Sequence, residues 1–184
     1  MEPSQGQSRK RFLLAGAVAS VILLVAAFTA TYVAGQMRNA NVTKLFGGAD
    51  GLQTVIVAEK AEAFRVARKK TEGGESKQDF GGAEILSGPI AVDEKTTREL
   101  AQILANPGTY GWDFAKGCIF DPGVAIRFTH KSSIVEVVFC FHCKELQVYR
   151  NGTKVGGEDF DAASNRLAAI LKRVFPDDDE IQKL

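Results

Sequence analysis

Apolar and charged positions divide the chain into one long uncharged segment and a series of shorter patterned elements after it. Phe12 to Val33 holds 22 residues without a charge, which at about 1.5 Å per residue spans the roughly 30 Å hydrocarbon core of a bilayer. Arg9 to Arg11 precede this segment directly, and the excess of positive charge predicts a cytoplasmic N-terminus. The pattern therefore predicts a transmembrane helix over residues 12–33, with residues 1–11 in the cytoplasm.

A cleaved signal peptide is the alternative for the same segment. The apolar core of a signal peptide is usually about 7–15 residues long, which is shorter than the segment here. An uncleaved signal anchor fits better, so the lipid bilayer is the partner expected for Phe12 to Val33. Both interpretations predict an extracytoplasmic C-terminal domain, and the anchor predicts a single-pass membrane protein.

Residues 34–51 are polar and contain several glycines, as expected of a linker, and residues 52–184 show the patterns of one α+β domain. Ala61 to Arg68 alternates between apolar and charged positions, which predicts a strand. Ala83 to Val92 is also predicted to be extended, with an interruption at Gly88-Pro89.

Two helices are predicted from capping residues and apolar spacing. Asp93 is a suitable N-cap, Leu100 and Leu104 repeat at helical spacing, and Asn106-Pro107-Gly108 ends the helix. A second helix begins near Asp161 and presents one apolar face, made by Leu167, Ile170, Leu171 and Val174.

A β-hairpin is predicted between the two helices. Val124 to Phe128 alternates into a polar turn at residues 130–133, and the next strand runs from Ile134 to Arg150. The apolar face of this strand changes between His142 and Glu145, which predicts a bulge. The expected fold is an antiparallel sheet of about four strands, with two helices on one face.

Composition and charge exclude some classes of function. Apolar residues make up 45% and charged residues 24% of the 184 positions, which is typical of a globular chain. The net charge is +1, which gives no general electrostatic attraction to nucleic acid.

Three cysteines, Cys118, Cys140 and Cys143, are the candidate chemical centre. A hairpin turn between residues 131 and 132 pairs Cys143 with Phe120 and Cys140 with Gly123, and brings Cys118 close to both. One hypothesis is a structural disulfide between Cys118 and either Cys140 or Cys143.

A zinc site and a redox dithiol are the alternatives. Zinc would use the three cysteines with His142 or His130 as the fourth ligand, although the pair Phe141-His142 is more typical of a strand than of a zinc turn. A dithiol would use Cys140 as the attacking and Cys143 as the resolving thiol, but it lacks the helix N-terminus that lowers a thiol pKa.

Other features suggest structural roles. Tyr110, Trp112 and Phe114 in one loop are interpreted as cover for the core, and a ligand-binding ledge is the alternative. No serine-hydrolase elbow and no glycine-rich nucleotide motif occurs in the sequence.

The segment Cys118-x-Phe120-x-Pro122-Gly123-Val124-Ala125-x-Arg127-Phe128, followed by Cys140-Phe141-x-Cys143, resembles an uncharacterised family of bacterial envelope proteins. The resemblance covers roughly residues 52–184 and implies a bacterial envelope setting in which the three cysteines act together. It implies no activity and no cofactor.

The function expected from the sequence is that of a membrane-anchored extracytoplasmic domain, a non-catalytic binding or structural module with an envelope protein as its partner. No catalytic residue and no cofactor is predicted. The alternative is a thiol- or zinc-dependent enzyme or redox protein centred on Cys118, Cys140 and Cys143.

Overall fold

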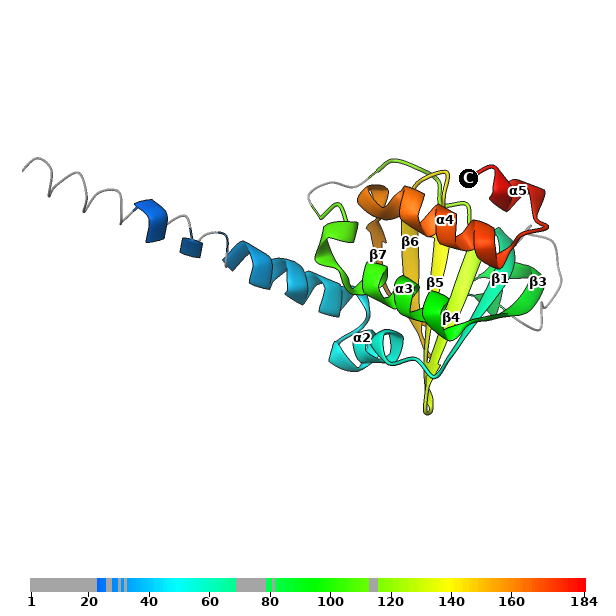
Figure 1. The fold of residues 1–184 in the computed structure, drawn as a ribbon, viewed down its shortest axis with the longest axis horizontal. Helices are drawn as coiled ribbons and strands as arrows, with labels where there is room; N and C mark the ends of the chain where they lie inside the picture. The colour runs from blue at the N-terminus through cyan, green and yellow to red at the C-terminus, as the bar shows by residue number, and fades with distance from the viewer. Residues whose placement is uncertain are drawn as a thin grey trace, which may run out of the picture. The chain divides into compact units, whose positions relative to one another are not determined.

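The computed structural model describes residues 23–25, 28–29, 31, 33–68, 79–80, 82–112 and 116–184 (Figure 1). The chain divides into two compact units, residues 1–39 and residues 40–184. The described residues of the first unit are all helical. The second unit contains the sheet and the candidate site.

The predicted membrane span is contradicted. Most of Phe12 to Val33 lies outside the described residues, and the described residues include no helix with the length and apolar character that crossing a bilayer requires. The helical residues 33–39 include the polar Gln36 and the charged Arg38, which lie beyond the apolar run. This finding overturns the predicted single-pass topology and the localisation that followed from it.

Among the described residues the sheet has seven antiparallel strands, instead of the predicted number of about four, in the order β2-β3-β1-β4-β5-β6-β7. Their bounds are β1 Lys60–Arg68, β2 Asp79–Phe80, β3 Ala83–Val92, β4 Val124–His130, β5 Ser133–Cys140, β6 Glu145–Arg150 and β7 Thr153–Asp159. The predicted strand from Ile134 to Arg150 is two strands, because residues 141–144 form a turn. Asn151-Gly152 then turns the chain into β7, and Phe80 forms part of the short edge strand β2.

The helices come from both predicted and unpredicted segments. Their bounds are α2 Ala49–Ile56, α3 Glu94–Ala105, α4 Ser164–Val174 and α5 Asp179–Gln182, with short 3-10 turns at Pro107–Thr109 and Asp161–Ala163. Asp93 caps α3 as predicted, since its carboxylate accepts a hydrogen bond from the Thr96 N–H at 2.9 Å. Figure 1 shows α3 and α4 side by side across one face of the sheet.

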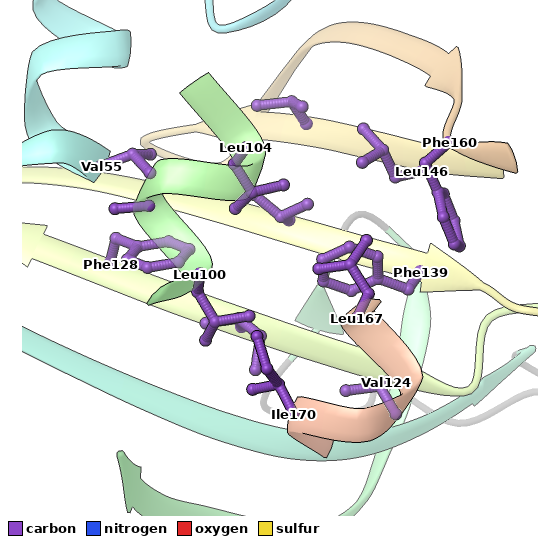
Figure 2. Packing of buried hydrophobic residues seen from close by; sticks show 14 of the residues in the cluster. Val55, Leu100, Leu104, Val124, Phe128, Phe139, Leu146, Phe160, Leu167 and Ile170 are labelled. Carbon is purple, nitrogen blue, oxygen red and sulfur yellow. The ribbon is translucent and has the colours of Figure 1, made fainter. Parts of the chain in front are cut away.

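The main core lies between this helical layer and the sheet. Figure 2 shows Leu100 and Leu104 of α3 with Leu167 of α4 over Phe128 and Phe139 of the sheet. All five side chains are fully buried. Burial of this continuous apolar surface is the main stabilising contribution to the fold.

The core extends upstream of residue 52 into the segment predicted as a linker. Val42, Leu45 and Phe46 are buried in it, and residues 40–45 are helical. Gly156 of β7 allows this helical segment to approach, because a Cβ there would lie 2.4 Å from the Leu45 carbonyl oxygen. The globular unit therefore begins at Ala40.

A smaller apolar cluster lies on the opposite face of the sheet, where strand alternation places Ala125 and Val138. The Arg127 guanidinium lies 5.1 Å from the Phe64 ring centroid and 4.7 Å from that of Phe80. Its Nη2 also contacts Glu136 at 2.8 Å. The cation thus pairs with a carboxylate and covers two aromatic rings.

Candidate binding cleft at the stapled end of the sheet

A disulfide joins Cys118 to Cys143, with their Cα atoms 5.9 Å apart. The predicted hairpin register is confirmed, because Val124 pairs with Phe139 and His130 with Ser133. This register places the loop before β4 beside the turn after β5. Of the two disulfide pairings left open by the sequence, the structure has Cys118–Cys143.

Cys140 is a free cysteine and is fully buried. Its Sγ accepts hydrogen bonds from the backbone N–H of Cys143 at 3.3 Å and from that of Asp121 at 3.4 Å. Cys140 therefore links the same two segments as the disulfide, by hydrogen bonds in place of a covalent bond.

The zinc and dithiol interpretations do not fit this arrangement. Two of the three proposed thiolate ligands, Cys118 and Cys143, are joined to each other, and a disulfide sulfur is not a thiolate. Nowhere in the described part of the chain do three or more His, Cys, Asp or Glu side chains form a group suited to a metal ion. His142 is exposed and His130 lies at the other end of β5.

The β5–β6 turn, residues 141–144, is the centre of the candidate site. Cys140 pairs with Glu145, so the turn reverses the chain within four residues. Lys144 adopts φ 54°, the left-handed conformation that favours glycine. This reversal, and not the predicted bulge, explains the change of apolar face between His142 and Glu145.

Two cavities lie against this turn and share Phe141, His142, Glu180 and Leu184 as lining residues. The first has a volume of about 260 Å³ and extends toward Arg65 and the loop before β4. The second has a volume of about 360 Å³ and extends toward the start of α4. We call the two cavities together the His142 cleft.

Arg65 of β1 fixes one wall of the His142 cleft. Its guanidinium contacts Asp178 at 2.6 Å and Glu180 at 2.5 Å and donates a hydrogen bond to the Gly123 carbonyl. Only 9% of the Arg65 side chain is exposed. Arg68 Nη2 also donates to the Phe120 carbonyl at 2.5 Å. Together the two arginines hold the loop before β4, and Arg65 also holds the segment that begins α5.

Asp178 connects this cation to the start of α5. Its carboxylate accepts hydrogen bonds from the Glu180 and Ile181 N–H groups at 3.1 and 3.0 Å. Burial acts to raise the pKa of Asp178, but these hydrogen bonds and the Arg65 guanidinium outweigh it and lower the pKa. The carboxylate is therefore stabilised in its charged form.

The sequence does not identify Arg65 or α5 as parts of a site. Arg65 and Asp178 are 113 positions apart, and neither residue belongs to a recognisable motif. The acidic run Asp177 to Glu180 predicts a helix start, which the cap by Asp178 confirms. Nothing in the sequence identifies the partner of that run on β1.

The loop aromatics mainly cover the core. Tyr110 is buried and its hydroxyl donates to the Leu104 carbonyl at 2.6 Å, and Trp112 Nε1 donates to the Pro107 carbonyl at 3.0 Å. Trp112 also lines a separate cavity of about 290 Å³ beside β7. Phe114 lies outside the described residues.

Comparison of the chain with protein-family models, with curated proteins and with solved structures finds no match.

Proposed function

We propose that residues 40–184 form a non-catalytic binding module whose ligand site is the His142 cleft. The observation that carries this proposal is the convergence of three constraints around one concave surface. The Cys118–Cys143 disulfide, the hydrogen bonds to Cys140 and the Arg65 ion pairs all fix segments that line or support the cleft.

Such constraints favour binding because they remove the cost of ordering the site when a ligand arrives. Loops that are free in solution lose conformational entropy on binding. Here the turn 141–144 is covalently joined to residue 118, and α5 is fixed to β1 through Arg65. The cleft is therefore formed before any ligand is present.

A non-catalytic role is supported by the side chains in and near the cleft. A nucleophile needs a general base within hydrogen-bond reach and a third group to orient the base. His142 makes no hydrogen bond within the described part of the chain, and Cys140 is buried against backbone N–H groups. His130 lies near the Glu59 carboxylate at 3.3 Å, away from the cleft.

The experiment is a fragment screen of the ¹⁵N-labelled full-length chain by amide chemical shifts. We expect binding fragments to shift the amides of residues 141–144, 164–165 and 180–184. Replacement of His142 by alanine should weaken the binding of these fragments, and the matched His130→Ala replacement should leave it unchanged. The proposal is refuted if no fragment of a chemically diverse set binds, or if the shifts lie outside the cleft.

A further inference from the structure

We infer that the larger cavity of the His142 cleft accepts a small amphipathic carboxylate, that is, a carboxylate attached to an apolar group. This inference rests on the proposed binding function and names the class of ligand. It is carried by the charges, the Ser164 hydroxyl and the apolar wall of the 360 Å³ cavity.

The charged side chains at this cavity favour an anion. Lys144 and Lys183 line it together with His142, and Glu180 is the one carboxylate side chain among its lining residues. The Glu180 carboxylate contacts Arg65 at 2.5 Å, and Arg65 shares its one positive charge between Glu180 and Asp178. The two lysines still leave an excess of positive charge among the side chains around the cavity, and opposite charge favours binding and orientation of an anion.

The two lysine ammonium groups are available for new contacts. Lys144 lies 3.9 Å from Asp161, which is longer than the approximately 2.7–2.9 Å of a charge-assisted hydrogen bond. Asp161 has a closer partner in Lys116. The Lys183 ammonium forms no ion pair within the described part of the chain.

Ser164 supplies a polar group at the wall of the cavity. Its relative exposure is 8%, and its hydroxyl makes no hydrogen bond to any described residue. The hydroxyl oxygen is accessible from the cavity and can donate a hydrogen bond there. A ligand oxygen in the cavity would accept this hydrogen bond.

Ser164 is also the first residue of α4, which has 11 residues and no side-chain hydrogen bond at its N-cap. The N-terminus of a helix carries partial positive charge from its backbone N–H groups. The Ser164 N–H, however, already donates to the Asp161 carbonyl in the preceding 3-10 turn, so the lysines supply the positive charge beside Ser164.

The rest of the cavity selects an apolar substituent. Phe141, Ala168 and Leu184 contribute apolar surface to its lining. A small inorganic anion would leave this surface in contact with water, whereas an alkyl or aromatic group would cover it. The volume of about 360 Å³ lies within the range typical of small-molecule sites.

The test compares hexanoate with hexanamide, a neutral molecule of the same shape, by titration into the full-length chain followed by amide shifts. We expect hexanoate to bind about tenfold more tightly, because charge-assisted hydrogen bonds are about twice as strong as neutral ones. Its largest shifts should fall on Ser164, Asn165 and the turn 141–144.

Two lysine variants give a matched control. Lys144→Gln should reduce hexanoate affinity about three- to tenfold and leave hexanamide affinity unchanged. Lys131→Gln changes the same residue type at the same φ of 54° in the β4–β5 turn, and should alter neither affinity. Equal losses of affinity for hexanoate and hexanamide in Lys144→Gln would show that the lysine affects the shape of the cavity and not its charge. That result would overturn the inference.

A second pair of compounds distinguishes the source of the carboxylate. A short peptide ending in leucine, with a free or an amidated C-terminus, tests whether a polypeptide end can supply it. Selective binding of the free-acid peptide or of hexanoate supports the inference, and the tighter of the two identifies the source.

The inference and the proposed function fail in different ways. Equal affinities for acid and amide in both pairs, or binding of neither, would overturn the assignment of an amphipathic carboxylate. The binding module itself would still be supported by fragments of another class in the cleft, and only failure of the whole fragment screen would remove it.

Discussion

The Arg65 guanidinium and the Asp178 carboxylate meet at 2.6 Å although the two residues are 113 positions apart. This contact fixes the segment that begins α5 against β1 and so determines the position of one wall of the His142 cleft. The Arg65 side chain is almost fully buried, and the Asp178 side chain is about one-quarter exposed.

Replacing Arg65 by methionine should destabilise the fold, because it leaves Asp178 and Glu180 without their cation. We expect a loss of about 1–3 kcal/mol, less than for a fully buried pair because both carboxylates reach solvent. Urea unfolding measures the change. Arg98→Met is the control, since its pair with Glu94 is exposed and should contribute less than about 0.5 kcal/mol.

The lowered pKa of Asp178 predicts how stability depends on pH. A carboxyl whose pKa is lower in the folded state contributes stability above its unfolded pKa of 3.8, and this contribution is lost as the pH falls through the folded pKa. The free energy of unfolding of the wild type, measured in urea, should therefore fall more steeply below about pH 4 than that of Asp178→Asn. Parallel curves for the two proteins would contradict the assigned role.

The contribution of Glu145 to stability should depend on pH in the opposite direction to that of Asp178. Burial raises the pKa of Glu145, and the charge of Asp159 raises it further. The charged form is therefore less favourable in the folded state, so stability falls as the pH rises above the ordinary value of 4.5. Glu145→Gln should stabilise the protein by up to about 1 kcal/mol at pH 7 and give a smaller gain near pH 4. If Glu145→Gln and the wild type have the same urea-unfolding midpoint at pH 7, this expectation is contradicted.

The disulfide predicts one free thiol per chain. Under denaturing, non-reducing conditions a thiol assay should detect Cys140 alone, and the native protein should react slowly because Cys140 is fully buried. Cys140→Ala should give no thiol under the same conditions. Three thiols from protein purified without reductant would contradict the Cys118–Cys143 bond.

Removal of the disulfide should lower stability. The bond closes a loop between residues separated by 25 positions, and such a constraint typically contributes about 2–4 kcal/mol by restricting the unfolded chain. The Cys118→Ser, Cys143→Ser double variant should show this loss in urea unfolding. An unchanged midpoint would mean that the hydrogen bonds to Cys140 alone hold the loop.

Local signals in the sequence identify α3 and the β4–β5 hairpin because each has its own chemistry. Asp93 supplies the cap of α3, and a polar turn separates two alternating strands. The turn after β5 has no such signal, since Phe141 to Lys144 contains no Gly, Pro, Asn or Asp. The reversal is therefore visible only as a change of apolar face.

The parts of the site that the sequence does not reveal depend on long-range contacts. Three cysteines indicate proximity, but the choice of Cys143 over Cys140 depends on the turn that follows β5. Arg65 lies in an ordinary alternating strand, and its partners lie in the last turns of the chain. Leu45 likewise enters the core only because Gly156 permits close approach.

The most direct test of the central claim is a crystal structure of the full-length chain soaked with the fragments that bind in solution. We expect a bound fragment between the turn 141–144 and α5, in contact with Phe141 or His142. Fragments bound only in the separate cavity beside Trp112, with the His142 cleft empty, would contradict it.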